Sequence, residues 1–449
     1  MVVAGDQSDP ADVLIIGAGP GGYVAALRAA QLGRSVTLVE AVRVGGVCLN
    51  EGCIPSKQLA RFAAVKAAAT DLADSGMPAF SGPPDMVAFQ KSRAAAVSAL
   101  VGGVESLLKS AKVTVIAGEA RFVGQTRVCV QTGEDAVRFF DFKDVVIATG
   151  SQPIPWAAAP FDGERVVDAS RALELDHVPA SMLIIGDDYI AVELAVAWAR
   201  LDSRVTLAAP NERLLPELDA DLSAAALRGA KLAGVDVLLN SHPDGPGDHE
   251  LVIVSMRRRA RLDGLDLAAA GISKPNNAFE VDPQMRIARH VFAIGDVTRG
   301  YGLAHTAMMQ GRVVGDVLGG KPSAFDTRAI PVAVFAAPEI ASVGSSQGVV
   351  GRFPLAALGR AVIEGKATTG FAKLVFDGEA GPLIGAHLAG PRATDLIAEM
   401  ALAIEMGATA EDLALTVHAH PTFAEALMEA AEVSLGRPIH VRPPRTPTP

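Results

Sequence analysis

Two of the three cysteines in this 449-residue chain lie close together in the stretch "GGVCLNEGCIPSK" (45–57). Four residues separate Cys48 from Cys53, and Pro55 followed by "SKQLARFAAVKAAA" predicts that Cys53 lies near the start of a helix. A helix N-terminus lowers the pKa of a thiol and so favours the nucleophilic thiolate. Zinc would need further ligands, and only Cys129 is left, with no paired histidine near it. The pattern therefore favours a reversible disulfide over half of a metal site.

An internal repeat predicts the elements that position these cysteines. A shift of 169 positions lays "DVLIIGAGPGGYVAALRAAQLGRSVTLVEA" (12–41) over "SMLIIGDDYIAVELAVAWARLDSRVTLAAP" (181–210). Each copy has an apolar run, a turn, an amphipathic helical stretch and a second apolar run, which is the pattern of a β-α-β unit. The chain is therefore expected to contain two nucleotide-binding folds.

The first copy has the features of a dinucleotide site. Gly17, Gly19 and Gly22 form G-x-G-x-x-G between strand and helix. The first allows the tight turn, the second lets the backbone approach the pyrophosphate, and the third lets the helix pack on the strand. Glu40 ends the second strand, where an acid accepts the ribose hydroxyls. A glycine-rich turn alone is weak evidence, because such turns also occur without a ligand. With strand, helix and acid in register, dinucleotide binding is the favoured interpretation.

The second copy lacks most of these features. Gly186 remains, but Asp188 replaces the second glycine and Ala191 the third, and Asp187 adds another charge. A carboxylate suits the N-terminus of a helix, but a pyrophosphate there would meet its bulk and its like charge. The position that matches Glu40 is Ala209. We therefore expect a fold that is retained while its nicotinamide dinucleotide site is impaired or lost.

Composition limits the class of partner. The chain is 50% hydrophobic and carries a net charge of −10. No run of Lys or Arg is long enough to follow a nucleic acid backbone, so nucleic acid is not an expected partner. The N-terminal apolar run has no basic region ahead of it, and no apolar stretch reaches the roughly 20 residues of a bilayer span. We expect a cytoplasmic protein with no membrane partner.

The cysteine segment, the "GAGPGGY" turn and "HAHPTFAEALMEAA" (418–431) together resemble the flavin-dependent pyridine nucleotide-disulfide oxidoreductases. Within that family the "LN-x-G-CIPSK" form is most similar to the dihydrolipoamide dehydrogenase group. "VVIATGS" (145–151), "VFAIGDVTRGYGLAHTA" (291–307) and "IPVAVFAAPEIASVG" (330–344) extend the resemblance over nearly the whole chain. It implies FAD as cofactor and the following contact residues: Gly17, Gly19, Gly22, Glu40, Lys57, Thr149, Gly150, Asp296 and Ala304.

The resemblance also implies roles at the reacting centre. Cys48 would be the thiol that exchanges with substrate, and Cys53 the thiol beside the flavin. His420 would be the base, contributed by the partner subunit of a homodimer and oriented by Glu425. His418 lies two residues away and competes for this role, and either histidine could instead be a packed side chain.

Lys57 matches the family lysine near the flavin, and Glu193, in the second repeat, matches its carboxylate partner. A buried lysine needs such a partner to remain charged. Since Glu193 is present while its neighbouring glycines are not, the second repeat is expected still to serve the flavin centre. Tyr189 also remains, and it matches the family tyrosine that covers the nicotinamide side of the flavin.

The predicted fold class is α/β, with two Rossmann-like dinucleotide-binding domains, one for FAD and a trimmed NAD-like one, and a C-terminal α+β dimerisation domain. The expected limits are 1–151 for the first part of the FAD domain with the redox disulfide, 152–271 for the NAD-like domain, 272–328 for the second part of the FAD domain, 329–441 for the interface domain and 442–449 for a disordered tail. Within the NAD-like region, Arg257, Arg258 and Arg259 form either an anion site or a solvated basic strand end.

Three functions fit these observations. The first is a homodimeric FAD enzyme that oxidises a small or carrier-bound dithiol, such as a lipoyl group, and passes the electrons to an acceptor other than NAD, for example oxygen, a quinone or a protein. The second is an NAD-dependent dihydrolipoamide dehydrogenase with atypical nucleotide contacts. The third is a non-catalytic flavoprotein subunit, which has no physical need for the cysteine, histidine and lysine set. The first is preferred, because several independent substitutions in the second repeat then have one cause.

Overall fold

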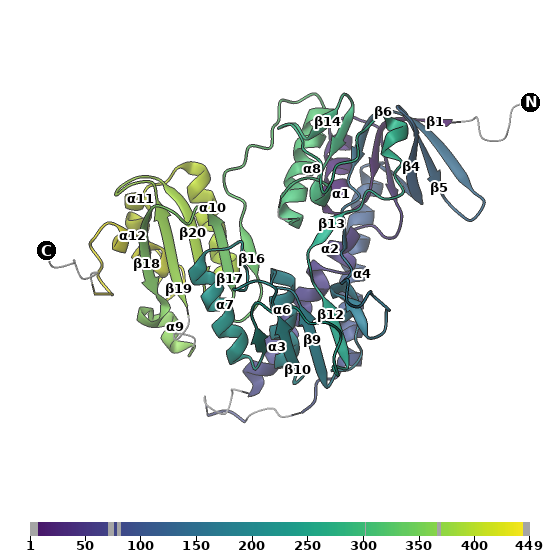
Figure 1. Cartoon of the computed structure of the whole chain (residues 1–449). Helices are drawn as coiled ribbons and strands as arrows, with labels where there is room; N and C mark the ends of the chain where they lie inside the picture. The colour runs from purple at the N-terminus through teal and green to yellow at the C-terminus, as the bar shows by residue number, and fades with distance from the viewer. Residues whose placement is uncertain (1–7, 71–75, 79–81, 301, 366–369, 443–449) are drawn as a thin grey trace, which may run out of the picture. The chain divides into compact units, whose positions relative to one another are not determined.

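The computed structural model describes residues 8–70, 76–78, 82–300, 302–365 and 370–442 (Figure 1). The chain divides into two compact units. Unit 1 comprises Met1–Gln58, Val87–Ile154 and Arg257–Asp326, and unit 2 comprises Leu59–Met86, Pro155–Met256 and Thr327–Pro449. None of the helices in the described ranges combines the length and apolar character needed to cross a membrane. Apart from Arg442, the expected C-terminal tail lies outside the described residues.

Unit 1 is built on an eight-stranded sheet of order β14-β15-β6-β1-β2-β3, with β4 and β5 attached through the pairing of β5 with β6. The central strand β1 runs parallel to both β2 and β6, so that Ile15 pairs with Leu38 and with Val146. The strands are β1 (Ser8–Ile16), β2 (Val36–Glu40), β3 (Thr114–Ala117), β4 (Glu119–Gly124), β5 (Arg127–Gln131), β6 (Val137–Ile147), β14 (Arg286–Ala288) and β15 (Val291–Ala293). A short ribbon pairs β7 (Ser151–Pro153) with β13 (Arg258–Ala260).

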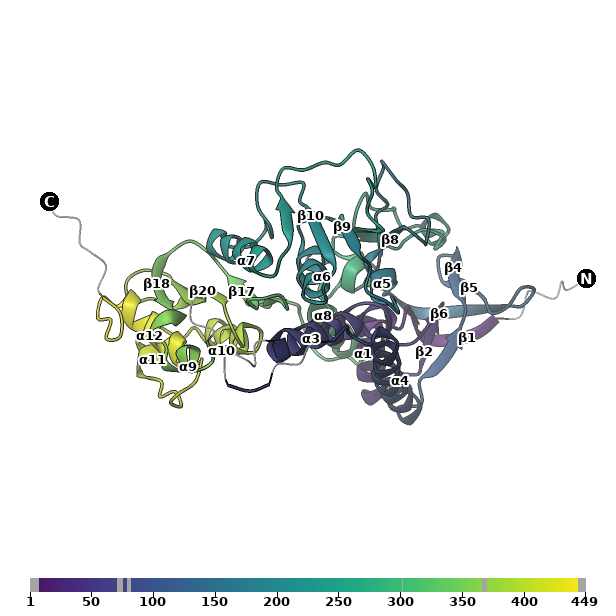
Figure 2. The same ribbon diagram turned by 90° about the horizontal axis from the view of Figure 1, so that it is seen from below.

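Alternation along β1 separates two apolar layers. Val13 and Ile15 face a core that includes Val101, whereas Leu14 and Ile16 face a second core that includes Phe122. The helices of this unit are α1 (Pro20–Gln31), α2 (Gly46–Asn50), α4 (Met86–Ser110), α8 (Ala304–Leu318) and the 3-10 turns η2 (Leu267–Ala270) and η3 (Gly295–Val297). Helix α3 (Cys53–Thr70) begins in unit 1 and continues into unit 2. Helices α1 and α8 lie side by side, as Figures 1 and 2 show.

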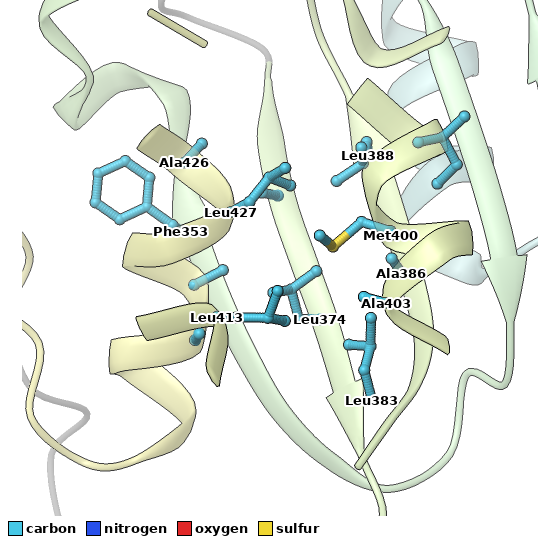
Figure 3. Close-up of a cluster of buried hydrophobic side chains, with 14 of the residues drawn as sticks. Phe353, Leu374, Leu383, Ala386, Leu388, Met400, Ala403, Leu413, Ala426 and Leu427 are labelled. Carbon is cyan, nitrogen blue, oxygen red and sulfur yellow. The ribbon is translucent and has the colours of Figure 1, made fainter. Parts of the chain in front are cut away.

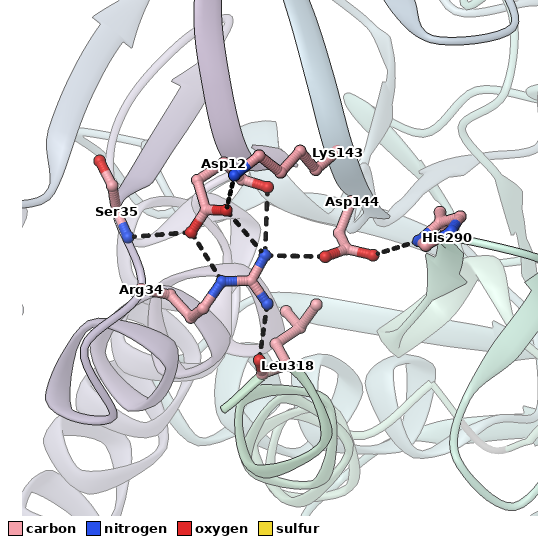
Figure 4. A network of polar contacts seen from close by, with 7 residues as sticks. All are labelled: Asp12, Arg34, Ser35, Lys143, Asp144, His290 and Leu318. Atoms are coloured by element: carbon pink, nitrogen blue, oxygen red, sulfur yellow. Dashed lines mark hydrogen bonds and ion pairs between the residues drawn. The ribbon is translucent and has the colours of Figure 1, made fainter. Parts of the chain in front are cut away.

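A polar network links strands β1 and β6 to the residues just before β2 (Figure 4). The Arg34 guanidinium lies between two carboxylates, with Nε 2.6 Å from Asp12 Oδ2 and Nη2 2.8 Å from Asp144 Oδ2. Its Nη1 also donates to the carbonyl of Leu318, at the end of α8. The hydrogen bond from Arg34 outweighs burial and lowers the pKa of Asp12 to about 2. This network stabilises the end of the sheet opposite to the glycine turn.

Unit 2 contains the second nucleotide fold, a five-stranded sheet of order β11-β10-β9-β12-β8 in which all neighbours are parallel. Its strands are β8 (Val166–Asp168), β9 (Ser181–Ile185), β10 (Arg204–Ala208), β11 (Asp236–Leu238) and β12 (Leu251–Val254), and its helices are α5 (Ala169–Ala172), α6 (Tyr189–Arg200) and α7 (Ala220–Leu232). The second strand-turn-helix-strand unit predicted from the repeat is therefore confirmed.

The C-terminal part of unit 2 is an antiparallel sheet of order β16-β17-β20-β19-β18 packed with helices. In its core Leu374 of β19 lies between Leu427 of α12 and Met400 of α10 (Figure 3). The elements are β16 (Val332–Val334), β17 (Ile340–Gly344), β18 (Val349–Pro354), β19 (Phe371–Phe376), β20 (Leu383–Ala389), η4 (Leu355–Ala357), α9 (Gly359–Ile363), α10 (Ala393–Met406), α11 (Ala410–Leu415) and α12 (Glu425–Ser434). The predicted fold class is confirmed.

Within unit 2, the second nucleotide-binding fold packs against the C-terminal domain through an ion-pair cluster and a close helix contact. Lys373 Nζ of β19 contacts Asp219 Oδ2 at 2.9 Å and Asp221 Oδ2 at 3.1 Å, where α7 begins. Gly229 of α7 packs so closely that a Cβ there would lie 2.0 Å from the carbonyl oxygen of Ala337. These contacts make the second fold an integral part of the C-terminal unit.

Candidate active site

The cysteine pair lies at the junction of two helices. Cys48 is in the short helix α2, and Cys53 is the first residue of α3. Both are free thiols, joined by a side-chain hydrogen bond. That hydrogen bond to Cys53, followed by partial burial, raises the pKa of the Cys48 thiol well above its usual range, while the charge of Lys57 opposes the rise. In the dithiol form Cys48 therefore keeps its proton, and its exchange with a substrate needs a base.

The first glycine turn has two glycines that the backbone requires and one that leaves space. At Gly17, with φ +104°, a Cβ would lie 2.3 Å from the carbonyl oxygen of Ala148. At Gly22 a Cβ would lie 1.9 Å from the oxygen of Gly17. At Gly19 the nearest atom, the Cα of Gly46, would be 4.0 Å away. The turn is therefore open where a pyrophosphate would approach the backbone.

Glu40 and Gly46 complete this turn. Glu40 Oε2 accepts a hydrogen bond from the amide of Ala18 at 2.7 Å, and Oε1 accepts one from Val42 at 2.9 Å. Gly46 has φ +57°, and a Cβ there would lie 2.7 Å from the Cα of Gly19. Gly46 thus allows the cysteine segment to sit directly on the glycine turn. Gly46 was not predicted from the sequence, although the "GG" before "VC" indicates a position that requires glycine.

Asp296, in the 3-10 turn η3, accepts a hydrogen bond from the Ser151 hydroxyl, with Ser151 Oγ 2.5 Å from Asp296 Oδ2. The neighbouring segment is held in place by its own contacts. Thr149 Oγ1 donates to the carbonyl of Arg261 at 2.6 Å, and Gly150 adopts φ +71°. Ser151 therefore contacts the Asp296 carboxylate directly. This contact was not predicted from the sequence.

Helix α8 begins at Ala304, and the amide groups of its first turn lack partners within the helix. In the same turn the Thr306 hydroxyl is buried and has no hydrogen-bond partner in the part of the chain that the structure describes. An orphaned buried hydroxyl at a helix N-terminus is a feature that a polar ligand would satisfy. Together with the open position at Gly19, it indicates that the residues present fit a flavin dinucleotide.

His420 and Glu425 form a pair in unit 2. His420 Nδ1 lies 2.8 Å from Glu425 Oε1, and the amide of Thr422 donates to Glu425 Oε2 at 2.8 Å. Burial alone would raise the pKa of Glu425, but the hydrogen bonds from Thr422 and His420 prevail and lower it. Glu425 is thus held as a carboxylate that orients the imidazole and leaves its Nε2 toward solvent.

The structure separates the two histidines. The His418 side chain is 7% exposed and its Nε2 lies 3.0 Å from Glu399 Oε1, whereas the His420 side chain is 78% exposed. His418 is therefore the packed histidine, and His420 is the one available to a substrate. The cysteines and Lys57 belong to unit 1, and the His420–Glu425 pair belongs to unit 2.

Glu193 is buried in helix α6, with 4% of its surface exposed. Its Oε1 accepts a hydrogen bond from the amide of Phe335 at 2.9 Å, which orients the carboxylate. Lys57 lies on α3, one turn after Cys53. The pairing of Lys57 with Glu193 stays a prediction.

The second nucleotide turn has the same backbone conformation as the first, but the side chain of Asp188 fills the space that Gly19 leaves open in the first turn. Asp188, the N-cap of α6, has φ −77° and ψ 175°, and Gly19, the N-cap of α1, has φ −68° and ψ −177°. Asp188 Oδ1 accepts hydrogen bonds from the amide of Ala191 and the hydroxyl of Ser255, both at 2.9 Å. Removal of the carboxyl group from solvent raises the pKa of Asp188 to about 6. A carboxylate thus occupies the helix N-terminus that the first turn leaves open.

The remaining contacts of this turn are also internal. Asp187 Oδ2 accepts a hydrogen bond from Asn211 Nδ2 at 2.7 Å. Ala209, at the position that matches Glu40, is fully buried. Ser255 follows β12, and no motif or spacing in the sequence indicated that it would reach the turn. Across the described ranges, no three His, Cys, Asp or Glu side chains are grouped so that they could hold a metal ion.

Comparison with known families gives two matches. The model of the pyridine nucleotide-disulphide oxidoreductases matches residues 11–311, and the model of the dimerisation domain of the same enzymes matches residues 330–431. Together they cover most of the chain, including the glycine turn, the cysteine segment and the His420–Glu425 pair.

Individual proteins agree with these matches. The dihydrolipoyl dehydrogenase of Geobacillus stearothermophilus is 42% identical over 470 residues, which cover 98% of this chain and 99% of that protein. The enzyme of the same name from Halobacterium salinarum is 40% identical over 474 residues, with 98% and 99% covered. Among solved structures, LpdA from Mycobacterium tuberculosis has a TM-score of 0.85 at 26% identity and covers 94% of this chain and 99% of its own. The HOCl-induced flavoprotein disulfide reductase RclA from Escherichia coli, in a Cu(II) complex, has a TM-score of 0.84 at 25% identity, with 95% and 99% covered.

Proposed function

The chain belongs to the pyridine nucleotide-disulphide oxidoreductase family, and we propose that it oxidises a dithiol through Cys48 and Cys53 and passes the electrons to an acceptor other than NAD. It is a flavin-dependent disulfide oxidoreductase with FAD as cofactor. The observation that carries the choice of acceptor is the Asp188 carboxylate at the N-terminus of α6.

The residues proposed to hold FAD are Gly17, Gly19, Gly22, Glu40, Lys57, Thr149, Gly150, Asp296 and Ala304. Bound there, FAD supplies a two-electron acceptor for the reduced cysteine pair. The open position at Gly19 and the orphaned hydroxyl of Thr306 support this assignment. Lys57 is proposed to pair with Glu193, whose carboxylate the Phe335 amide already orients.

The thiol chemistry begins with the disulfide form of the pair. His420 takes the proton of one substrate thiol, and the resulting thiolate attacks Cys48, which breaks the Cys48–Cys53 bond and leaves Cys53 as thiolate. The second substrate thiol then attacks the mixed disulfide and releases Cys48 together with an oxidised substrate. His420 gives the first proton to Cys48 as that thiol leaves, in keeping with the raised pKa of that thiol, and takes the proton of the second substrate thiol. Two electrons and two protons leave the substrate in total.

The proposal for the acceptor rests on charge and space at the second turn. A pyrophosphate there would meet the bulk and the negative charge of Asp188, because the amide of Ala191 and the hydroxyl of Ser255 already bind that carboxylate. Ala209 offers no carboxylate to a ribose. These two losses affect different parts of a dinucleotide, so each weakens NAD binding independently of the other.

A second candidate is an NAD-dependent dihydrolipoyl dehydrogenase. The 42% identity over the full length of an enzyme with that name favours it. It would require nucleotide contacts other than those at the second turn. The substrate class is shared by both candidates: a small or carrier-bound dithiol of the lipoyl kind.

The chain carries the family's dimerisation domain. We propose a homodimer in which His420 of one copy serves the cysteine pair of its partner, which the high exposure of His420 supports. Because the pair must cycle between thiol and disulfide, we place the enzyme in the reducing cytoplasm.

The test is to follow the flavin absorbance of the purified holoenzyme under anaerobic conditions. Dihydrolipoamide is expected to reduce it promptly, while NADH leaves it unchanged. Prompt reduction by NADH would overturn the proposed acceptor and support the second candidate. The Cys48→Ser variant is the control: if dihydrolipoamide reduces it as fast as the wild type, the dithiol chemistry assigned to the pair is wrong.

A further inference from the structure

The run Arg257-Arg258-Arg259 does not form one basic patch. Arg257 and Arg259 are exposed, and Arg259 Nη2 lies 3.0 Å from Asp263 Oδ2. Arg258 is half-buried at the start of β13, which pairs antiparallel with β7. Since side chains alternate along a strand, Arg258 and Arg259 point to opposite sides of this ribbon. Neither interpretation from the sequence, an anion site or a solvated strand end, describes Arg258.

Arg258 donates two hydrogen bonds to a single residue, Ser151. Its Nε donates to the hydroxyl oxygen of Ser151 at 2.8 Å, and its Nη2 donates to the carbonyl oxygen of Ser151 at 2.9 Å. Ser151 is 6% exposed, so these charge-assisted hydrogen bonds lie in a largely dry environment. The backbone and the hydroxyl of Ser151 are thereby held in one orientation.

The donors and acceptors available determine the direction of the hydrogen bonds that run from Arg258 through Ser151 to Asp296. A guanidinium can only donate hydrogen bonds, and a serine hydroxyl has a single proton. Because the hydroxyl oxygen accepts from Arg258, its proton is directed to Asp296 Oδ2, 2.5 Å away. The cation, the hydroxyl and the carboxylate form one chain in which each bond strengthens the next.

We propose that Arg258 is a positioning residue for FAD, which acts through Ser151 to hold the Asp296 carboxylate in the orientation that binds the flavin's ribityl chain. The inference rests on the proposed function, since it takes Asp296 as a flavin contact. It assigns to the arginine run a role that neither its composition nor its spacing indicated.

A purely structural role in the β7–β13 ribbon is the competing explanation. The ribbon has backbone pairing of its own, and two further contacts support it: Thr149 Oγ1 to the carbonyl of Arg261 at 2.6 Å, and the amide of Arg261 to the carbonyl of Gly150 at 2.9 Å. None of these involves the guanidinium of Arg258. Loss of that group is therefore expected to weaken the flavin site more than the ribbon.

The experiment measures the dissociation constant of FAD by reconstituting the apoprotein and following the quenching of flavin fluorescence. Arg258→Gln is expected to bind FAD about tenfold more weakly than wild type, the effect of losing a hydrogen bond to a charged group. Arg259→Gln is the matched control, with unchanged affinity, and Arg258→Lys, which keeps the charge but not the fork, is expected to lie between them. The flavin reduction potential, measured on the same variants, is expected to shift only in the Arg258 series.

Ser151→Ala keeps the test decisive even if Arg258→Gln does not fold. Its affinity for FAD is expected to fall by the same factor as that of Arg258→Gln. The variant with both substitutions is expected to bind FAD no more weakly than either single variant, because both residues act through one chain of hydrogen bonds. An FAD affinity of Arg258→Gln or Ser151→Ala equal to that of Arg259→Gln, with only the melting temperature lowered, would overturn the inference. Asp296→Asn tests whether Asp296 contacts FAD at all. Normal FAD affinity in this variant would overturn both the assignment of Asp296 to the flavin and the role of Arg258. Weak FAD binding in Asp296→Asn with normal binding in the Arg258 variants would overturn the role of Arg258 alone.

Discussion

The hydroxyl of Ser255 donates to the carboxylate of Asp188 across 2.9 Å, so the acid that replaces a glycine in the second nucleotide turn is bound by its own fold. The same carboxylate caps helix α6 through the amide of Ala191. The turn therefore keeps its geometry while the donors that would bind a pyrophosphate are engaged internally.

Replacing Asp188 by glycine is expected to strengthen the binding of NADH at least about tenfold, because the variant removes both a like charge and the bulk of the side chain. Asp188→Asn keeps the bulk and the cap but removes the charge, so it is expected to give a smaller gain. Titration of nucleotide fluorescence measures both. Unchanged affinity in both variants would show that the carboxylate is not what excludes the nucleotide.

Asp188 also predicts a dependence of stability on pH. Its pKa is about 6 in the folded chain against an ordinary 3.8, so the folded state binds the proton more tightly than the unfolded state. This contribution is present below about pH 4 and is lost as the pH rises through 6. Asp188→Asn, which does not titrate, is therefore expected to gain stability relative to wild type between pH 4.5 and 7, by on the order of 2 kcal/mol.

Melting temperatures across that pH range test this prediction. Since the hydrogen bond from Ser255 lowers the pKa of Asp188, Ser255→Ala is expected to move the pH-dependent step to higher pH. A difference between Asp188→Asn and wild type that is constant with pH would contradict the raised pKa.

His420→Gln is expected to slow the anaerobic reduction of the flavin by dihydrolipoamide by about 100-fold to 10,000-fold, the usual loss on removing a general base. His418→Gln is the matched control and is expected to lose far less, because His418 is packed against Glu399. Stopped-flow absorbance at one pH distinguishes them: the rate of flavin reduction should fall by this factor only without His420. Equal losses in both variants would count against His420 as the base.

The three cysteines are expected to differ in reactivity. In the dithiol form Cys48 and Cys53 are partly exposed and should be alkylated by iodoacetamide. The rate at Cys48 should be low at neutral pH and rise with pH, because its pKa is raised and only the thiolate reacts. Cys129 is 1% exposed and should react only after unfolding. Peptide mass spectrometry reads out each site. Labelling of Cys48 and Cys53 that is identical before and after oxidation would contradict a reversible disulfide.

Lys373→Met is expected to destabilise unit 2 by about 2 kcal/mol, because the Asp219 side chain, 4% exposed, loses its cation. Lys143→Met is the control: Lys143 is 77% exposed and also contacts an aspartate, so its loss should change stability little. Thermal unfolding of the two variants gives the comparison. Equal melting temperatures would mean that Asp219 finds another partner.

The sequence by itself determined the local elements of this protein. The repeat, the glycine turn and the start of α3 at Cys53 were all predictable, because strand alternation, helix periodicity and turn glycines act over a few residues. The two aspartates of the second turn were visible for the same reason. Resemblance to a family then indicated which of these elements hold the flavin.

Only the tertiary structure decided which side chains meet. Ser255, just after strand β12, contacts Asp188 from 67 residues further along the chain. Arg258 acts on Asp296 through Ser151, which is 145 residues from that carboxylate. Likewise the resemblance favoured His420 over His418 as the base, but it is the contact with Glu399 that makes His418 a packed residue. Such contacts depend on how strands and helices are arranged in space, and no spacing along the chain encodes that arrangement.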